Sequence, residues 1–385
     1  MAATVPVREA PAGAGDLARR LAEAAGEGLR VRPVGGGTKL AWGMPGEPVD
    51  LELSTAGLAE VREHDAGDFV AVVEAGASLE ALRERFAASG ERLALDPPTL
   101  GAATIGGVVA TGDSGPLRHR YGAPRDLVVG VTVALSDGTL SRAGGKVIKN
   151  VAGYDLGKLL AGSFGTLGVI VEVALRLHPV PDATATAIGC GADPSRVAVA
   201  AGALAHQRLE LESLDVRWSD GEGAVLARAA GAVPRPLAER AAAALREASL
   251  DVEVVDDDDG LWERQRAGQR GRVAAGDAVV RVSAVQAQLG DVLAAARALG
   301  GEAVGRAALG LCWVRLPAAE AATVERMRAE LAPAPSVVLD APAAVREAVD
   351  PWGEVDPAAL ELIRRVKARF DPAGALNPGR FVGAL

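Results

Sequence analysis

Two glycine-rich stretches decide how this chain folds: GAATIGGVVATGDSG at residues 101–115 and VRPVGGGTKL at residues 31–40. Each combines glycine with threonine or serine beside an apolar segment that is typical of a β-strand. Glycine has no Cβ and tolerates positive φ, so such a stretch brings backbone N–H groups close to an anion. We therefore expect the two stretches to form loops that hold the diphosphate of a large nucleotide cofactor.

The composition is that of a globular protein with room for two domains. The chain has 385 residues, of which 49% are hydrophobic, and a net charge of −9. This charge argues against nucleic acid as a partner, because nucleic acid requires a basic face. No apolar run approaches the roughly 18 residues of a membrane span, and the first residues lack the apolar core of a signal peptide. We therefore expect no membrane span and a cytoplasmic location.

Cysteine and histidine are too scattered to predict a metal site. Cys190 and Cys312 are far apart, and the four histidines form no HxH or HxxxH pair. Iron–sulfur and structural zinc sites need three or four closely spaced ligands. We expect reduced structural thiols and no metal.

The pattern of apolar residues predicts three parts: a glycine-loop domain at 1–181, an α+β domain at 182–345, and a tail at 346–385 that returns to the first domain. In the first part, we expect a helix over 16–25 capped by Asp16, and a buried strand over 127–135. The second part predicts a sheet with helices on one face and shows no internal sequence repeat. A helix over 357–370 followed by two Pro/Gly turns indicates a tail with a fixed position.

Neither glycine stretch matches the common phosphate-binding fingerprints. No GxxxxGK[ST] string occurs, and neither stretch is GxGxxG between a strand and a helix. GGGT alone is therefore also compatible with a plain turn. The second stretch strengthens the phosphate interpretation, because residues 104–107 begin an apolar segment that predicts a helix with a free N-terminus.

In combination, five strings resemble the vanillyl-alcohol-oxidase superfamily of FAD enzymes. They are PVGGGTK, PPTLGAATIGGVVATGDSG, RYGAPRD, VIKNVAGYDLGKLLAGSFGTLGVI and LNPGRF, in this order. Within that superfamily, KNVAGYDL is most similar to the FAD-binding subunit of bacterial glycolate oxidase. The resemblance covers about residues 30–180 and 365–385. It implies an α+β fold: a PCMH-type FAD-binding domain of two subdomains, with a cap domain built of an antiparallel sheet and helices.

The resemblance also implies which residues bind the cofactor. The first loop would wrap the diphosphate, the second would form the opposite wall and run along the flavin, residues 168 and 170 would meet the adenine side, and the tail would reach the isoalloxazine. No histidine or cysteine lies in the first loop, so we expect non-covalent FAD. The implied residues are Gly35, Gly36, Gly37, Thr38, Lys39, Thr99, Gly101, Thr104, Ile105, Gly107, Thr111, Gly112, Ser114, Gly115, Gly168, Ile170 and Asn377.

Candidates for catalysis are few. A 2-hydroxy-acid substrate needs a cation for its carboxylate and a base for its hydroxyl proton. His119, Tyr121 and Lys149 are weak candidates, and each also has a structural interpretation: a surface histidine, a ring that packs on the cofactor, a loop-closing lysine. Arg380 either reaches an anion or caps the tail.

Two departures from the related D-2-hydroxyacid dehydrogenases bear on function. Those relatives have a histidine- and glutamate-rich metal site in the cap and a glutamate where this chain has Phe164, whereas His206 is the one histidine of this cap. The resemblance thus implies an FAD-binding subunit of a glycolate (2-hydroxy acid) oxidase or dehydrogenase complex. It would work beside a second flavoprotein subunit and an iron–sulfur subunit, and through them at the inner membrane. A self-sufficient FAD-dependent dehydrogenase and a non-catalytic FAD-binding assembly subunit remain alternatives.

Overall fold

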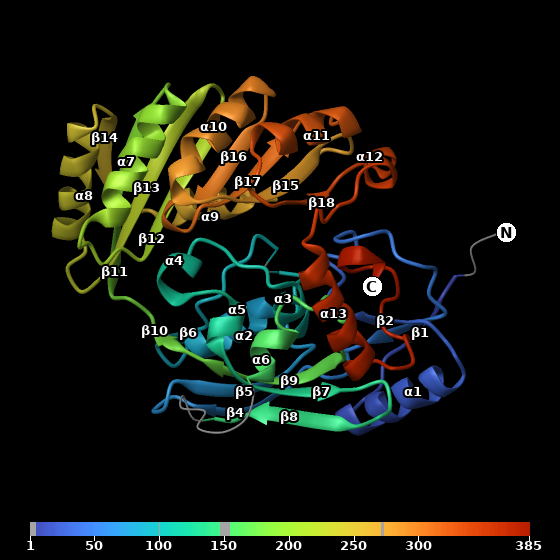
Figure 1. Cartoon of the computed structure of the whole chain (residues 1–385). Coiled ribbons are helices and arrows are strands. Elements are labelled where there is room, and N and C mark those ends of the chain that lie inside the picture. Colours follow the sequence, from blue (N-terminus) through green and yellow to red (C-terminus); the bar gives the residue numbers. More distant parts are fainter. Residues whose placement is uncertain (1–4, 100, 147–154, 271–272) are drawn as a thin grey trace. The chain divides into compact units, whose positions relative to one another are not determined.

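A computed structural model describes residues 5–99, 101–146, 155–270 and 273–385. The described chain divides into two compact units (Figure 1). The first unit comprises the described parts of residues 1–114, 122–180 and 355–385, and the second comprises 115–121 and 181–354. The domain boundaries expected at 181/182 and 345/346 remain predictions; in the structure, the second unit continues to residue 354 and also contains 115–121.

The first unit begins with a small parallel sheet. Its strands are β1 (Val7–Glu9), β3 (Leu51–Ser54) and β2 (Val31–Val34), in this spatial order. Leu51 is paired with Val7 on one side and with Val31 on the other. Because β2 leads directly into the first glycine stretch, this sheet fixes where that stretch begins.

A second sheet of the first unit has five antiparallel strands in the order β4-β5-β9-β7-β8. The central strands β5 (Val70–Glu74) and β9 (Val169–Arg176) are buried on both faces except at a few positions, and accordingly read as nearly continuous apolar runs. The others are β4 (Val61–Asp65), β7 (Val128–Ala134) and β8 (Leu140–Gly144). A two-stranded ribbon, β6 (Glu91–Arg92) with β10 (His178–Pro179), completes the strands of this unit.

Helix α1 (Ala14–Gly26) joins the two sheets of the first unit. Its fully buried Leu17 and Leu21 belong to one apolar cluster with Leu51 of the small sheet and Val171 of the large one. The expected cap at Asp16 is wrong: Gly13 is the N-cap and Asp16 lies in the first turn. A carboxylate there still suits the positive end of the helix dipole.

Short helices carry the loops of the first unit. Ser78 caps α2 (Leu79–Ala87), with its Oγ accepting from the Ala81 amide at 3.2 Å. The others are α3 (Ile105–Thr111), α5 (Pro124–Leu127), α6 (Leu156–Leu160), α13 (Pro357–Phe370) and the 3₁₀ turn η3 (Val382–Ala384). The bounds of α13 agree with the helix expected from the sequence.

The second unit is an eight-stranded antiparallel sheet in the order β14-β11-β13-β12-β16-β17-β15-β18. Its first half has the chain order β11, α7, β12, β13, α8, β14, and its second half β15, α10, β16, β17, α11, β18. Both halves are thus β-α-β-β-α-β motifs, joined where β12 pairs with β16. This structural repeat has no counterpart in the sequence, because the same layout tolerates different apolar side chains.

The elements of the second unit have the following bounds. The strands are β11 (Ala183–Gly191), β12 (Ser213–Ser219), β13 (Glu222–Gly231), β14 (Asp251–Val255), β15 (Ala278–Ser283), β16 (Glu302–Arg306), β17 (Leu311–Leu316) and β18 (Ser336–Asp340). The helices are α4 (Arg118–Tyr121), α7 (Pro194–His206), α8 (Arg235–Glu247), α9 (Asp259–Gly268), α10 (Leu289–Ala298), α11 (Ala321–Glu330) and α12 (Ala343–Ala348), with 3₁₀ turns η1 (Gln286–Gln288) and η2 (Ala307–Leu309).

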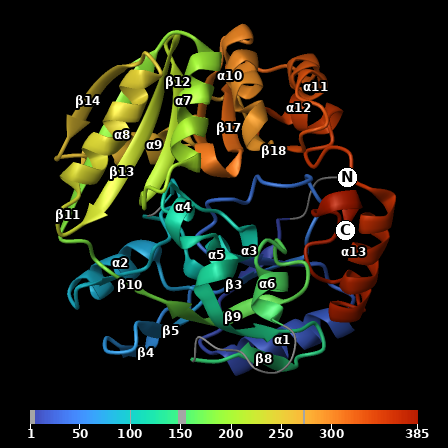
Figure 2. The same cartoon turned by 60° about the vertical axis from the view of Figure 1, so that its left-hand side comes forward.

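Helices cover both faces of this sheet, so the expectation of a single helical face is wrong. Ala187 of β11 belongs to the large core formed with α7, α8 and α10, which lie along one face in Figures 1 and 2. Its neighbour Ile188 packs instead with Leu261 and Trp262 of α9. Successive residues of a strand point to opposite faces, so α9 covers the other face.

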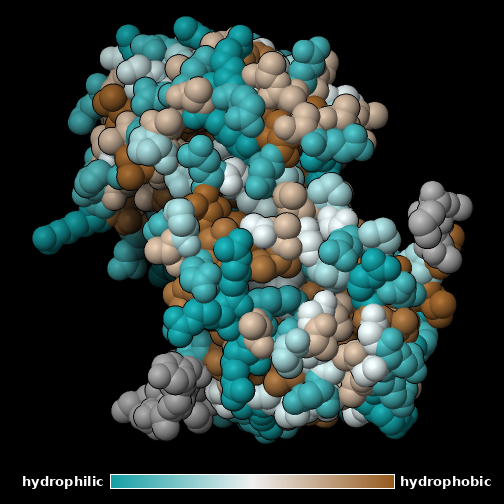
Figure 3. Space-filling view, turned by 45° about the vertical axis from the view of Figure 1, so that its right-hand side comes forward, coloured by the Kyte–Doolittle hydropathy of each residue, from teal (hydrophilic) through white to brown (hydrophobic). Residues whose placement is uncertain are grey.

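The described surface offers no extended apolar field on the face shown in Figure 3, where hydrophobic residues lie in small groups among hydrophilic ones. Scattered exposed apolar side chains are normal for globular proteins. None of the helices in the described part is both long and apolar enough to cross a bilayer.

Candidate functional site

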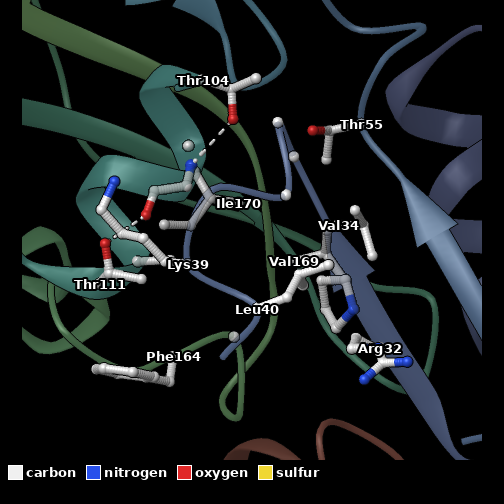
Figure 4. Close-up of a pocket in the computed structure, with 18 of the residues that line it drawn as sticks. Arg32, Val34, Lys39, Leu40, Thr55, Thr104, Thr111, Phe164, Val169 and Ile170 are labelled. Atoms are coloured by element: carbon white, nitrogen blue, oxygen red, sulfur yellow. Dashed lines mark hydrogen bonds between the residues drawn. The ribbon is translucent and has the colours of Figure 1, made fainter. Parts of the chain in front are cut away.

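The first unit contains an open pocket, with about 780 Å³ of unfilled space including its mouth (Figure 4). Four segments meet there: the end of β2 with the first glycine stretch, helix α3, the turn before β9, and the tail. The lining residues are Arg32, Pro33, Val34, Gly35, Gly36, Gly37, Thr38, Lys39, Leu40, Thr55, Thr104, Gly106, Gly107, Ala110, Thr111, Phe164, Gly165, Gly168, Val169, Ile170, Asn377 and Arg380.

Glycine allows the first loop to touch the backbone of the second. A Cβ on Gly36 would lie 1.7 Å from the Ala102 carbonyl oxygen, and one on Gly35 would lie 2.2 Å from Thr104 Oγ1. Gly37 has a φ of +74°, which L side chains rarely adopt. Within the described chain, the amides of Gly36 and Gly37 donate to no carbonyl. These N–H groups line the pocket and are therefore available to an anion.

Lys39 of the first glycine stretch forms an ion pair with Asp113 of the second. Its side chain is 5% exposed, and its Nζ lies 3.2 Å from Asp113 Oδ2 and donates to Thr99 Oγ1, also at 3.2 Å. The lysine charge is thus already matched by a carboxylate of the second stretch. Backbone amides, and not this ammonium group, are the main donors that the first loop offers to a phosphate.

Helix α3 forms the opposite wall. Thr104 is its N-cap and accepts from the Gly107 amide at 3.4 Å. Thr111 donates from Oγ1 to the Gly107 carbonyl at 2.8 Å (Figure 4). Ile105 is fully buried and anchors the helix, which ends at Gly112 with a φ of 65°. The helix is therefore held by its apolar side while its polar end faces the pocket.

The third wall is the turn before β9. Phe164 has a φ of +56°, an uncommon conformation for an aromatic residue that usually needs support from its surroundings. Asn377 supplies that support by donating from Nδ2 to the Phe164 carbonyl at 2.7 Å. At Gly168, a Cβ would lie 2.4 Å from Val133 Cγ2, so glycine is required for the close packing of this turn on β7.

The tail is fixed by Lys367, whose side chain is largely buried. Lys367 of α13 donates from Nζ to the carbonyls of Thr166 at 2.8 Å and Leu376 at 2.9 Å, and pairs with Asp371. Burial lowers the pKa of Lys367, while the Asp371 hydrogen bond opposes that shift. Arg380 is buried and donates to the carbonyls of Lys39 and Leu40. The tail therefore returns to a specific place, and Arg380 caps the first glycine stretch.

The structure gathers most of the expected cofactor residues into this one pocket. Those in the lining are Gly35, Gly36, Gly37, Thr38, Lys39, Thr104, Gly107, Thr111, Gly168, Ile170 and Asn377. The others, Thr99, Gly101, Ile105, Gly112, Ser114 and Gly115, do not line it. Thr99 accepts a hydrogen bond from Lys39, and Ile105 is fully buried. Their role toward a cofactor remains a prediction.

Sequence reasoning missed several lining residues, among them Val34, Leu40, Thr55 and Val169. These are ordinary apolar or hydroxyl side chains at strand ends, and nothing in their pattern distinguishes them from core residues. Arg32 was missed as well, although an arginine three residues before the first glycine of the loop was a usable signal. Its guanidinium is held by Glu52 at 3.0 Å.

The catalytic candidates do not lie in the described pocket. Lys149 is outside the described residues. His119 and Tyr121 belong to α4 of the second unit. Burial, with a smaller contribution from Arg120, lowers the pKa of His119, so its ring is neutral at pH 7. Tyr121 donates to Glu212 Oε1 at 3.2 Å. Catalysis by any of the three remains a prediction.

The pocket's donor set fits a dinucleotide with two phosphates. Amides without a protein acceptor lie at Gly36 and Gly37, hydroxyls lie at Thr38, Thr104 and Thr111, and apolar side chains surround them. Such a mixture suits a cofactor with a charged centre and planar aromatic ends. No group of three histidine, cysteine, aspartate or glutamate side chains is arranged as a metal site among residues 5–99, 101–146, 155–270 and 273–385.

Two family models match the chain: "FAD binding domain" over residues 7–144 and "FAD linked oxidases, C-terminal domain" over residues 353–381. Glycolate oxidase subunit GlcE of Escherichia coli is 39% identical over 122 residues, 31% of this chain and 35% of the relative. D-lactate dehydrogenase of Archaeoglobus fulgidus is 40% identical over 156 residues, 40% of this chain and 34% of the relative. The matches thus span about a third of the length of these relatives.

A solved structure of alkyldihydroxyacetonephosphate synthase is similar with a TM-score of 0.71 at 15% identity, covering 96% of this chain and 76% of that one. At this identity the similarity concerns the fold alone. Together, the matches confirm the expected α+β fold with an FAD binding domain, FAD as the cofactor, and the relationship to FAD-linked oxidoreductases that include a glycolate oxidase subunit.

Proposed function

We propose that this chain, whose FAD binding domain spans residues 7–144, is a subunit of a 2-hydroxy-acid oxidase or dehydrogenase complex that acts on glycolate. Glycolate and D-lactate, named in its relatives, are both 2-hydroxy acids. Bound FAD supplies an acceptor for the hydride equivalent that leaves the carbinol carbon. The proposed location is the cytoplasm, with access to the inner membrane through partner subunits.

The chain's own residues would bind and orient this cofactor. The amides of Gly36 and Gly37 would donate to the phosphates, and the hydroxyls of Thr104 and Thr111 line the same pocket. Preorganised amides in a partly buried site stabilise negative charge without reorganisation at the moment of binding. Asn377 would keep the Phe164 turn in place beside the cofactor, since it holds that carbonyl at 2.7 Å.

The observation that carries the proposal is the meeting of the two glycine stretches. Gly36 approaches the Ala102 carbonyl so closely that no Cβ fits, yet its amide has no acceptor in the described chain. This amide lines the pocket, so a bound phosphate would supply the acceptor that the described chain does not.

The two cysteines of this chain are free thiols. Cys312 is buried and its pKa is raised to about 12, and burial also raises the pKa of the half-buried Cys190. Both thiols therefore stay protonated at neutral pH, and thiolates are the ligands that clusters need. Electrons would leave this subunit toward a second flavoprotein subunit and an iron–sulfur subunit.

The test is an anaerobic titration of the purified chain, loaded with FAD, with glycolate and D-lactate. The proposal expects bound flavin whose visible band is not bleached by the isolated chain, and bleaching on addition of the complex's other subunits. Failure to bind FAD would overturn the whole proposal. Flavin that no substrate reduces even in the reconstituted complex would favour a non-catalytic assembly subunit.

A second candidate is a self-sufficient FAD-dependent hydroxy-acid dehydrogenase with His119 as its base. A base must be neutral to accept a proton, and the lowered pKa of His119 meets this condition at pH 7. Bleaching of the isolated chain by substrate would select this candidate. In that case His119→Gln should slow the bleaching by about 100-fold or more while the FAD content stays unchanged.

A further inference from the structure

The pocket of the first unit has one aromatic residue in its described lining, Phe164 (Figure 4). The other described lining residues are glycines, small hydroxyl residues, aliphatic residues, two arginines, a lysine and an asparagine. Aromatic residues make up only 3% of the chain, so the abundance of rings does not explain one at this position. Phe164, the turn that contains it and the C-terminal tail all belong to the first unit.

The backbone at Phe164 has a conformation that glycine would adopt at a lower cost. Its φ is +56°, in the left-handed region that a Cβ disfavours. The next residue, Gly165, has a φ of +68°, and a Cβ there would lie 3.2 Å from Asn377 Nδ2. The same amide group donates to the Phe164 carbonyl at 2.7 Å. The tail therefore supports a strained phenylalanine at the wall of a pocket, and strained residues are concentrated at ligand sites.

The ring of Phe164 packs against a ring of the tail. Its centroid lies 5.8 Å from that of Phe381, and the two ring planes are tilted by 43°. This distance is within the range of favourable aromatic pairs. Phe381 is itself fixed, because its amide donates to the Leu385 carbonyl at 2.7 Å and its carbonyl accepts from the Ala384 amide at 3.1 Å. The ring of Phe164 is thus ordered in advance, and an ordered side chain loses little entropy when a ligand binds.

Backbone conformation alone does not identify a binding residue, as Phe69 shows. Phe69 also belongs to the first unit and has a φ of +52°, directly before β5. It is 37% exposed and does not line the pocket. Phe164 combines the same backbone conformation with a place in the pocket wall, and this combination points to a ligand.

We propose that Phe164 is a binding residue for the cofactor and that its ring stacks on one of the planar heteroaromatic rings of FAD. FAD ends in two such rings, adenine and isoalloxazine, and each presents a π-face to a phenyl ring. The glycine stretches would hold the diphosphate, while Phe164 would orient one end of the molecule. This inference rests on the proposed function, because it requires FAD in the pocket.

The test compares Phe164→Leu and Phe164→Tyr with wild type by calorimetric titration of the FAD-free proteins. Leucine keeps an apolar side chain but lacks the π-face, whereas tyrosine keeps the ring. The matched control is Phe69→Leu, which removes a ring from the same backbone conformation outside the pocket. Each protein is titrated with FAD and separately with ADP, which contains the adenine and the diphosphate but no flavin.

We expect the dissociation constant for FAD to rise by about tenfold in Phe164→Leu and to stay within about twofold of wild type in Phe164→Tyr and Phe69→Leu. The ADP titration identifies the ring. An equal loss of ADP affinity in Phe164→Leu assigns Phe164 to the adenine, and unchanged ADP affinity assigns it to the isoalloxazine. Either result supports the proposal.

Two results contradict the proposal while the proposed function stands. Phe164→Leu could bind FAD as tightly as wild type does, or the leucine and tyrosine variants could lose the same affinity, and in both cases the aromatic ring would not matter. A wild-type protein that binds neither FAD nor ADP is a different result, because the proposed function then fails together with the role of Phe164.

A further variant covers the case in which Phe164→Leu does not fold. Asparagine tolerates a positive φ better than most residues and has no aromatic face, so Phe164→Asn removes the ring without added backbone strain. Its dissociation constant for FAD should also rise by about tenfold, while its melting temperature stays close to that of wild type. Wild-type FAD affinity in this variant would overturn the proposal.

Discussion

The pocket of the first unit and the buried network of the second are built from different parts of the chain. The pocket is made of main chain: Gly35, Gly36 and Gly168 matter because they have no side chain. The network is made of side chains: Arg306 and Asp215 matter because of the charges they carry. The comparison teaches that a site built from glycines can be recognised in the sequence as a continuous motif. A network of side chains is formed by residues that are far apart in the sequence, and none of them stands out alone.

The largest expected effect tests the main-chain half of the comparison. In Gly36→Ala the new Cβ would meet a backbone oxygen at 1.7 Å, so the two glycine stretches must separate. FAD affinity should fall by at least about 100-fold, measured by titration of the FAD-free protein. The control is Gly101→Ala, whose Cβ would meet only Glu80 Oε2 at 3.5 Å. Equal losses in both variants would contradict a pocket built on close backbone approach.

The next prediction tests the side-chain network through the pH dependence of the free energy of unfolding. Burial raises the pKa of Asp215 to about 6, against 3.8 for the free side chain, while Arg306 opposes the shift. The folded state therefore keeps this proton to a higher pH than the unfolded chain does. The free energy of unfolding contributed by Asp215 thus falls by about 3 kcal/mol as the pH rises from about 4 to about 6.5.

This prediction is checked by urea unfolding of wild type and Asp215→Asn between pH 4 and 7. Trp218, Trp262 and Trp313 all lie in the second unit and report on it by fluorescence. The stability advantage of wild type over the variant should shrink by about 2–3 kcal/mol across this range. Other carboxylates, such as Asp277 with its lowered pKa, act in the opposite direction but cancel in the difference. A constant difference would sink the prediction.

The smallest effect sharpens the comparison at Asn377, where backbone and side chain act together. Asn377 has a φ of +45° and donates to the Phe164 carbonyl at 2.7 Å. Asn377→Ala loses the hydrogen bond and strains the backbone, for a cost of about 2 kcal/mol, whereas Asn377→Gly loses the hydrogen bond alone, for about 1 kcal/mol. Thermal melts of the two variants separate the terms; identical melts would mean that the backbone conformation carries no strain.

Much of the first unit could be predicted from the sequence because local signals and tertiary needs agree there. The helix expected to begin at residues 104–107 starts at Ile105, and the helix over 357–370 has the expected bounds. The return of the tail to the pocket was also anticipated from its Pro/Gly turns. These features depend on residues that are neighbours in the sequence.

The rest could not be predicted, because it depends on pairings between distant residues. Arg306 and Asp215 are 91 positions apart, and each alone reads as a surface charge near a strand. Ala187 packs against the helices on one face of the sheet and Ile188 against α9 on the other. A strand that is apolar on both faces has no hydrophobic alternation, so its sequence does not indicate which helix covers which face. The transfer of residues 115–121 to the second unit has no local signature either.

The first unit can complete its fold only after its C-terminal tail has been synthesised. Val31 of β2 donates to the Ala375 carbonyl at 2.7 Å, and Asn377 donates back to the Val31 carbonyl at 2.8 Å. Residues 181–354 are translated between these partners. At a ribosomal speed of about 5–20 residues per second, the half-built first unit waits roughly 10–35 seconds for its last pieces. FAD therefore meets a finished pocket only after residues 181–354 have been translated.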